Sequence, residues 1–397
     1  MVDNFAQLYY SDSYQSEFTA EVTEVRSENN KLWMSLSQTC FYPEGGGQPG
    51  DQGILQVIRP NEQNRQIVKV LDTILHDTVI WHQVDQLLPQ GSAVVGQIDF
   101  ARRYDLMQQH SGEHIFSGIV NREYGYSNVG FNINSTEMTF DFDGDLTWAQ
   151  IARVEQEANQ AICENIPIEI RYITRSEQDK WTYRSKLQLD QNIRLVIIPG
   201  YDTCACAGTH LARTGEIGQI KIIKRESYKG GVRLTALCGA RALSYFQNIL
   251  QIMRDVGEIM SANPYNLFDK AKNQQAEISN LKLEINKKNR AWLDLFVQKL
   301  QPDPKRIILT DPEFSKQEWK YVCQYLIRYI SDFVGILTSQ KDHKHTLFLY
   351  SESVDLRTII PELKEKFNFR GGGNQNLIQG TLQGQISIIK DFFNEIA

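Results

Sequence analysis

Two pairs of residues in this chain have the types and the spacing of metal ligands. His110 and His114 lie four residues apart in a stretch with helical periodicity, so both imidazoles project from one face of a helix. Cys206 and His210 are also four residues apart. One thiolate and three imidazoles suit Zn²⁺ in tetrahedral geometry. We therefore predict that these four residues bind zinc, with Cys204 as the second candidate for the thiolate.

One of these pairs also fits a competing interpretation. His110, Glu113 and His114 match the H-x-x-E-H signature of inverzincin metallopeptidases, in which the glutamate is the general base. That chemistry needs a carboxylate further along the chain as the third ligand, and it gives Cys206 and His210 no role. A metallopeptidase is therefore the less favoured alternative.

The composition of the chain is that of a globular protein with a modest negative charge. Its 397 residues include 42 Lys and Arg against 48 Asp and Glu, and six cysteines. The N-terminus lacks a basic and apolar leader, and the apolar runs are too short to cross a bilayer. We expect a cytoplasmic protein without membrane contact, whose cysteines are ligands or buried side chains rather than disulfides.

The hydrophobic patterns before and after these residues predict an α+β protein. Residues 1–95 contain short alternating stretches separated by turn residues, which indicates a small β-rich, barrel-like domain with a glycine loop. Residues 96–245 mix helical stretches at 100–122 and 146–164 with strands, including a hairpin of 217–224 and 231–238. This second region is the predicted zinc-binding domain.

The last part of the chain predicts two further regions. Residues 246–300 are polar and helical, with an apolar seven-residue repeat through Ile278 and Ile285. This connector is either an amphipathic helix that lies on its own protein or a coiled coil that forms a homodimer, in which the C-terminal domain would take part as well. Residues 301–397 alternate strands and helices and end in a glycine run, which indicates a small α/β domain.

Four stretches, in order, resemble the editing domain of alanyl-tRNA synthetases and its freestanding relatives, the AlaX proteins. The first is similar to the family pattern T-x-F-Y-P-x-G-G-G-Q-x-x-D-x-G, and the others carry the H-x-x-x-H pair, the C-x-G-T-H pair and the segment that follows them. The stretches are Thr39–Gly53, Arg103–His114, Cys206–His210 and Gly215–Ala242. Together they cover about residues 1–245.

The C-terminal region resembles the end of the DHH-associated domain of the synthetase. Its glycine run, residues 371–373, is followed by Asn374, Gln375 and Asn376, where the family has Arg-Pro-Asp. This departure puts direct contact of that loop with nucleic acid in doubt.

The resemblance implies a zinc-dependent aminoacyl-tRNA deacylase that removes serine from mischarged tRNA(Ala). An alanine pocket rejects serine only about 10²-fold because serine merely adds a hydroxyl, so a second site must remove the error. Whether glycine is also removed stays open. No aminoacylation domain fits before residue 1, so we expect editing in trans without ATP. The alternative from another class is a tRNA-binding protein with a structural zinc and no turnover.

The first motif supplies candidates for substrate contacts. By resemblance, Thr39 is the candidate for a hydrogen bond with the serine hydroxyl. The alternative is that it is an ordinary strand threonine. Gly45, Gly46 and Gly47 allow the backbone to approach the terminal adenosine or the ester closely. Gln48 either donates a hydrogen bond to the substrate or braces this loop, and the first interpretation is slightly favoured.

Hydrolysis and tRNA binding suggest further residues. Glu113 is a candidate general base, although its helical position can direct it away from the metal. Four protein ligands leave zinc no open position, so a ligand is displaced, the ion becomes five-coordinate, or it only organises the pocket. We predict that a basic strip contacts the phosphates of the acceptor stem. Its residues are Lys221, Lys224, Arg225 and Arg233. The alternative is that the strip is only a solvent-exposed charged face.

Overall fold

The computed structural model describes residues 7–58, 66–185, 193–299, 307–310, 314–338 and 344–395. The chain divides into two compact units, Met1–Asp255 and Val256–Ala397. The predicted boundary at residue 301 lies outside the described residues. Within the described ranges, no helix combines the length and apolar character that crossing a bilayer requires.

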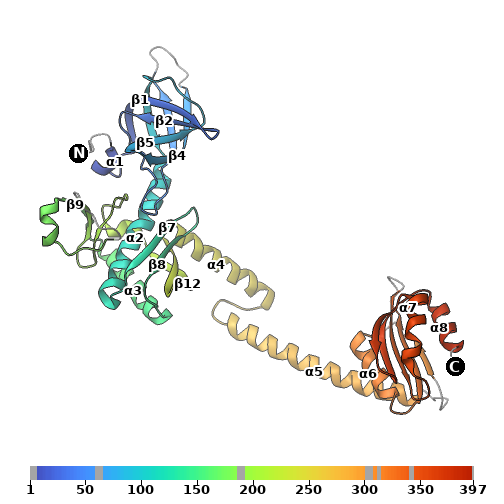
Figure 1. Cartoon of the computed structure of the whole chain (residues 1–397). Coiled ribbons are helices and arrows are strands. Elements are labelled where there is room, and N and C mark those ends of the chain that lie inside the picture. The colour runs from blue at the N-terminus through green and yellow to red at the C-terminus, as the bar shows by residue number, and fades with distance from the viewer. Residues whose placement is uncertain are drawn as a thin grey trace. The chain divides into compact units, whose positions relative to one another are not determined.

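The first unit begins with a closed barrel of six antiparallel strands (Figure 1). Alternate side chains of the strands fill the barrel; in β4, Val68 and Val70 point inward while their neighbours are exposed. The β-rich, barrel-like prediction is therefore confirmed. Around the barrel the order is β1 (Glu17–Glu28), β2 (Lys31–Leu36), β5 (Val79–Val84), β4 (Ile67–His76), β3 (Gly53–Val57) and β6 (Ala93–Ile98).

Helix α2 (Phe100–Tyr124) connects the barrel to the rest of the unit. Asp99 caps its first turn by accepting a hydrogen bond from Arg102 N, and Gly125 ends it with a φ of 70°. Residues 106–120 are all buried, so this helix is surrounded by the fold rather than lying on it. A Cβ at Gly118 would collide with the Tyr201 carbonyl, so glycine permits the close packing.

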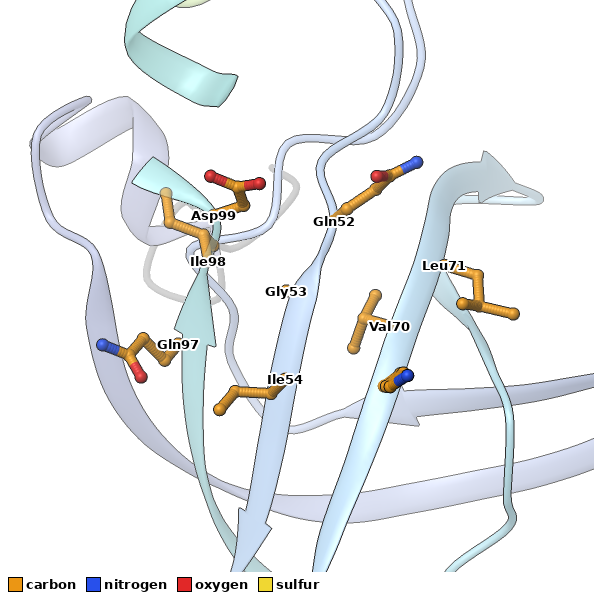
Figure 2. Close-up of a pocket in the computed structure, with 9 residues that line it drawn as sticks. Gln52, Gly53, Ile54, Val70, Leu71, Gln97, Ile98 and Asp99 are labelled. Atoms are coloured by element: carbon orange, nitrogen blue, oxygen red, sulfur yellow. The ribbon is translucent and has the colours of Figure 1, made fainter. Parts of the chain in front are cut away.

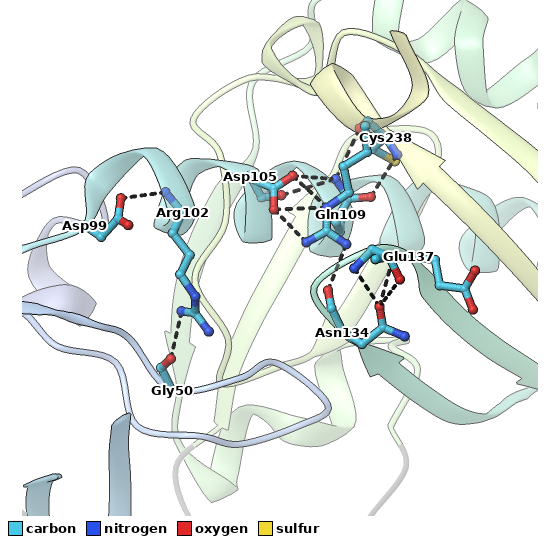
Figure 3. Close-up of polar contacts among 10 residues, drawn as sticks. Gly50, Asp99, Arg102, Asp105, Gln109, Asn134, Glu137 and Cys238 are labelled. Atoms are coloured by element: carbon cyan, nitrogen blue, oxygen red, sulfur yellow. Dashed lines mark hydrogen bonds and ion pairs between the residues drawn. The ribbon is translucent and has the colours of Figure 1, made fainter. Parts of the chain in front are cut away.

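Polar contacts fix α2 against its neighbours, as Figure 3 shows. At its start, Arg102 Nη1 donates to the Gly50 carbonyl at 2.8 Å, across to the glycine-rich segment that follows β2. One turn further, Asp105 accepts from the Arg241 guanidinium at 2.6 Å. The Gln109 side-chain amide accepts from Cys238 N at 2.8 Å and donates to the Cys238 carbonyl at 3.2 Å.

A buried ion pair links α2 to the segment that precedes β3. The Arg103 guanidinium, which has no exposed surface, contacts the Asp51 carboxylate and also donates to the Cys40 carbonyl at 2.7 Å. Asp51 accepts a further bond from Tyr42 N at 2.6 Å. Because every polar group of this pair is satisfied, the charges are tolerated in the interior.

Two small sheets pack against α2. The four-stranded sheet has the order β12 (Ile220–Tyr228), β13 (Gly231–Cys238), β8 (Met138–Phe142) and β7 (Asn128–Ile133). The three-stranded sheet has the order β11 (Asp202–Ala205), β10 (Ile193–Ile198) and β9 (Glu169–Ile173). Helix α3 (Trp148–Glu164) begins with a capping box formed by Thr147 and Gln150.

The predicted hairpin is present, but its turn is shorter than expected. We placed the turn at residues 225–230, whereas β12 continues to Tyr228 and only Lys229 and Gly230 connect the strands. These two residues have φ values of 46° and 84°. Positive φ at both central residues is the geometry of a two-residue hairpin turn, whose twist matches the strands it joins.

Two helices follow the sheets: α4 (Gly239–Met260) starts in the first unit, and α5 (Leu267–Lys299) belongs to the second. The second unit also holds a five-stranded sheet, with α6 (Lys316–Leu326), α7 (Ile360–Phe367) and α8 (Ile386–Glu395). Its strand order is β14 (Ile307–Thr310), β15 (Asp332–Thr338), β16 (Lys344–Ser351), β18 (Leu377–Gln383) and β17 (Arg370–Gly373). The glycine run forms β17, an exposed edge strand.

Candidate metal centre

The structure brings the four predicted metal ligands together. One ligand atom from each of His110, His114, Cys206 and His210 lies within 4.8 Å of the others. The imidazole centroids are 4.6 to 5.3 Å apart, and Cys206 Sγ is 3.4 Å from His110 Nε2. Helix α2 supplies two of these residues and the loop after β11 supplies the other two.

Two hydrogen bonds orient the imidazoles of the helix. His110 Nδ1 lies 2.9 Å from Gln48 Oε1, and His114 Nδ1 lies 2.8 Å from Asp202 Oδ2. Both partners are acceptors, so the proton is held on Nδ1 and the lone pair of Nε2 faces the centre. The Gln48 amide nitrogen donates to Thr209 Oγ1 at 2.8 Å, which explains why its oxygen faces His110.

The remaining donor atoms fit a bound cation. His114 Nε2 and both ring nitrogens of His210 are buried and have no hydrogen-bond partner. Leaving such atoms unpaired is costly unless something binds them. Burial alone would raise the pKa of the Cys206 thiol, but His110 and His210 outweigh it and hold that pKa well below its usual range. A thiolate with imidazole lone pairs is a donor set that zinc prefers.

The geometry separates the two candidate cysteines. Cys206 Sγ belongs to the group with all three histidines, whereas Cys204 belongs to a buried group with His114 and Asp202. The Asp202 carboxylate is already bound by the Arg184 guanidinium at 2.7 and 2.8 Å. The geometry therefore favours Cys206 over Cys204 as the sulfur that joins the three histidines.

Asp202 and Arg184 were missed by the sequence analysis. They form a chain in which the half-buried Arg184 holds the buried Asp202, and Asp202 holds His114. A carboxylate beside a ligating histidine is a general expectation, but no motif marks which of the 48 acidic residues supplies it. Only the pairing of β10 with β11 places Asp202 beside the helix.

The glycine loop is packed more tightly than a free substrate cradle would be. Gly45 and Gln48 exchange two backbone hydrogen bonds of 3.0 Å, and Gly47 accepts from Ile133 N at 2.8 Å. A Cβ at Gly47 would overlap the Phe131 backbone, so this glycine serves the contact with β7. Gly46 is exposed and has no neighbour near its Cα, which leaves the tip of the loop open.

Gln48 is placed differently from the favoured prediction. We expected its amide to donate to the substrate, but the side chain is fully buried and bonds to His110 and Thr209. In this structure the side-chain amide is therefore engaged within the protein, with its oxygen beside the candidate metal ligand His110.

Thr39 has its hydroxyl engaged inside the barrel. The hydroxyl lies 3.0 Å from His82 Nε2 and accepts from Phe41 N at 3.0 Å. Burial lowers the pKa of His82 to about 4, so the ring is neutral near pH 7, and its Nδ1 donates to the Met34 carbonyl. The Thr39 hydroxyl is therefore the donor to His82, which leaves it one free lone pair.

The Glu113 carboxylate is engaged by side chains outside the candidate metal-ligand set. The sequence suggested that it could point outward, but it is buried, accepts from Ser117 Oγ at 2.5 Å and contacts the Asn128 amide. A general base must reach the reacting water, so the role predicted for Glu113 requires its carboxylate to exchange these partners for that water.

The cations of the predicted basic strip are paired with acidic side chains. Arg233 makes two bonds of 2.7 Å to Asp141 and lies over the Tyr228 ring at 3.8 Å. This differs from the predicted free phosphate contact, because the guanidinium is already engaged. The other pairs of the strip are Lys221 with Glu155, Lys224 with Glu226, and Arg225 with Asp145.

A cavity of about 430 Å³ lies elsewhere, over strands β3, β4 and β6 of the barrel (Figure 2). Its lining includes Gln52, Leu71 and Gln97, and none of the four metal-ligand candidates. The cavity is therefore separate from the chemistry described above.

Comparisons with known proteins agree with these motifs. Residues 6–102 match the family model for tRNA synthetases class II (A), and residues 193–235 match the threonyl and alanyl tRNA synthetase second additional domain. The chain is 28% identical to the alanyl-tRNA editing protein AlaX-L of Pyrococcus horikoshii, over 97% of this chain and 96% of that protein.

Alanine–tRNA ligases are also similar. The ligase of Pyrobaculum neutrophilum is 30% identical over 97% of this chain, and that of Pyrococcus furiosus is 31% identical over 76%. The chain spans only 43% and 33% of those two proteins. With the editing protein matched almost end to end, these findings confirm the resemblance predicted from the motifs: the chain is similar to the AlaX alanyl-tRNA editing proteins.

Proposed function

We propose that this protein is a zinc-dependent aminoacyl-tRNA deacylase that removes serine from mischarged tRNA(Ala) in trans. The observation that carries the proposal is the convergence of His110, His114, Cys206 and His210, with unpaired ring nitrogens, in a chain similar to an alanyl-tRNA editing protein along its length. A bound zinc ion would activate water or polarise the ester carbonyl. Such a substrate implies that the protein acts in the cytoplasm.

Side chains around the candidate ligands support this chemistry by fixing their orientation. Gln48 and Asp202 hold two imidazoles in fixed orientations, which preorganises the ligand set before metal or substrate arrives. The three histidines are buried, whereas Cys206 is half-buried and Ala207 beside it is exposed. The ester of the substrate would therefore approach from the Cys206 side, where the tip of the glycine loop at Gly46 is also exposed.

A tRNA-binding protein with a structural zinc and no turnover is the second candidate. It is favoured by the ligand count, because four protein ligands fill a tetrahedral shell and such closed sites are usually structural. A metallopeptidase has less support, since the Glu113 carboxylate is engaged by Ser117 and Asn128 and does not belong to the group of candidate ligand atoms.

Deacylation of charged tRNA separates these candidates. We would incubate the protein with seryl-, glycyl- and alanyl-tRNA(Ala), with and without a zinc chelator, and follow the loss of the amino acid. Rapid loss of serine with alanine retained supports the proposal, and the glycyl substrate shows whether glycine is also removed. Tight binding without hydrolysis would support the structural-zinc candidate, and peptide cleavage would support the peptidase.

A cysteine pair provides the matched control for that assay. Cys206→Ala removes the proposed thiolate ligand and should abolish hydrolysis, whereas Cys163→Ala replaces an exposed cysteine outside the site and should not. Equal activity in both variants would show that the metal centre does not serve the reaction.

We also propose that the protein forms a homodimer through α5. Along this helix the apolar side chains of the seven-residue repeat are exposed, including Ile278, Ile285 and Trp292. An exposed apolar stripe with this period is what a coiled coil buries. Light scattering of the purified protein would show twice the chain mass of 45.7 kDa, and a monomer mass would contradict the proposal.

A further inference from the structure

An arginine that has no role in the proposed metal centre lies on its exposed side, next to Cys206. Arg194, on β10, donates from Nη1 to the Cys206 carbonyl at 2.8 Å, and Cys206 N donates back to the Arg194 carbonyl at 3.1 Å. The guanidinium is thereby held beside the one ligand of the four that is partly exposed.

Arg194 also retains unused charge and hydrogen-bonding capacity. Its Nε is buried without a partner, and no carboxylate of the described residues forms an ion pair with it. Arg233 and Arg241, in the same unit, each form an ion pair with an aspartate. An uncompensated guanidinium next to a centre that accepts a ligand is suited to an anionic group such as a phosphate.

Aromatic rings flank this guanidinium. Its Cζ lies 5.4 Å from the centroid of the Tyr10 ring, on the short helix α1 (Leu8–Ser11). Tyr172 on β9 is the cross-strand neighbour of Arg194, and half of its surface is exposed. Aromatic faces interleaved with a free cation are the combination that holds single-stranded nucleic acid, because bases stack on the rings while the cation meets the backbone.

We propose that Tyr10, Arg194 and Tyr172 form the docking surface for the unpaired 3′ end of the substrate RNA. This inference rests on the proposed function, in which the ester to be broken sits on the terminal ribose. The nucleotides that precede that ribose must then lie beside the metal centre, where these residues are. A base stacks on a tyrosine ring, and Arg194 neutralises the adjacent phosphate.

The test measures binding, so that it does not depend on turnover. The probes are uncharged tRNA(Ala) and the same tRNA trimmed of its unpaired 3′ nucleotides. Wild-type protein should bind the intact RNA about 10-fold more tightly than the trimmed RNA, since one base stacked on an aromatic ring contributes about that much. Tyr10→Ala and Arg194→Gln should lose most of this preference while they bind the trimmed RNA as wild type does.

Two variants separate a docking role from a structural one. Tyr10→Phe keeps the ring and should keep the preference. Tyr228→Ala removes a tyrosine that forms a similar pair with Arg233 on the β12–β13 hairpin, at 3.8 Å, and should leave the preference unchanged. Zinc content, measured for every variant, confirms that the centre is intact.

Failure of this inference is distinguishable from failure of the proposed function. If Tyr10→Ala retains the full preference for the intact RNA, or if Tyr228→Ala loses it equally, the docking surface is overturned. If wild-type protein shows the preference but does not deacylate seryl-tRNA(Ala), the docking surface stands and the proposed function fails.

Discussion

The metal centre and the β12–β13 hairpin are the two regions that the sequence marked for binding, and they differ in how their polar groups are partnered. At the centre, ring nitrogens of His114 and His210 are buried with no partner. On the hairpin, the predicted phosphate-binding cations already contact acidic side chains: Lys221 with Glu155, Arg225 with Asp145, and Arg233 with Asp141.

This difference shows that buried polar atoms without a partner indicate a bound ligand better than residue type does. A buried nitrogen without a partner costs about 1–3 kcal/mol, so a fold that retains several of them in one place indicates that something else binds there. A cation that already contacts a carboxylate has no such need, and much of its charge is compensated. Residue type alone predicted binding at both the centre and the hairpin. Of these two regions, only the centre has buried ring nitrogens without a partner.

Removal of a metal ligand should give the largest effect. His210→Ala deletes two of the unpaired nitrogens, so bound zinc should fall from about one per chain to less than about a tenth, and kcat/KM for seryl-tRNA(Ala) should fall by at least about 100-fold. Elemental analysis and the deacylation assay measure both. His76→Ala, at an exposed histidine, is the control and should change neither. Full zinc content in His210→Ala would contradict the assignment.

Removal of a group that orients a ligand should have a smaller effect. Asp202→Asn weakens the hydrogen bond that holds His114, and we expect zinc affinity to fall by about 10- to 100-fold. Competition with a chromophoric chelator measures this. Asp141→Asn breaks a comparable aspartate–arginine pair on the hairpin and should leave zinc affinity unchanged. If both variants lose zinc equally, the centre is no more specific than the hairpin.

Thr39 tests whether a residue outside the ligand set chooses the substrate. If its free lone pair meets the serine hydroxyl, Thr39→Val should reduce the preference for seryl- over alanyl-tRNA(Ala) by about 10-fold. His82→Leu removes the same internal hydrogen bond from the other side and should lower only the melting temperature. Equal preference in wild type and Thr39→Val would assign Thr39 a purely structural role.

Neutralising the hairpin should have the smallest effect. In a variant with Lys221, Lys224, Arg225 and Arg233 all changed to Gln, we expect tRNA affinity to change by less than about 2-fold, because these cations are already paired. The measurement is log affinity against log salt, in which each lost phosphate contact flattens the slope by about 0.7 to 0.9. A slope flatter by about 3 would show that these cations contact phosphates and would remove the contrast between the two regions.

Much of the local structure followed from the sequence. Alternating apolar residues predicted barrel strands such as β4, and helical periodicity predicted α2 within two residues of its observed end. The closure of six strands into a barrel gives no local signal, because it depends on β1 pairing with β6, from Glu21 with Ala93 to Glu17 with Gln97. The turn of the β12–β13 hairpin was placed too broadly, since the polar strand end at 225–228 resembles a loop in composition.

The amino-acid sequence alone specifies the available chemistry, which is three imidazoles and a thiolate. They occur in two pairs, and the four-residue spacing within each pair brings its two side chains close together in a single helix or loop. Packing of distant segments selects Cys206 rather than Cys204, places Gln48 and Asp202 beside the histidines, and engages the Glu113 carboxylate with Ser117 and Asn128. It likewise decided that Arg233 is paired and Arg194 is not. The reason is physical: spacing controls contacts within one helix or loop, whereas partners about 100 residues apart meet only when α2 and the sheets pack together.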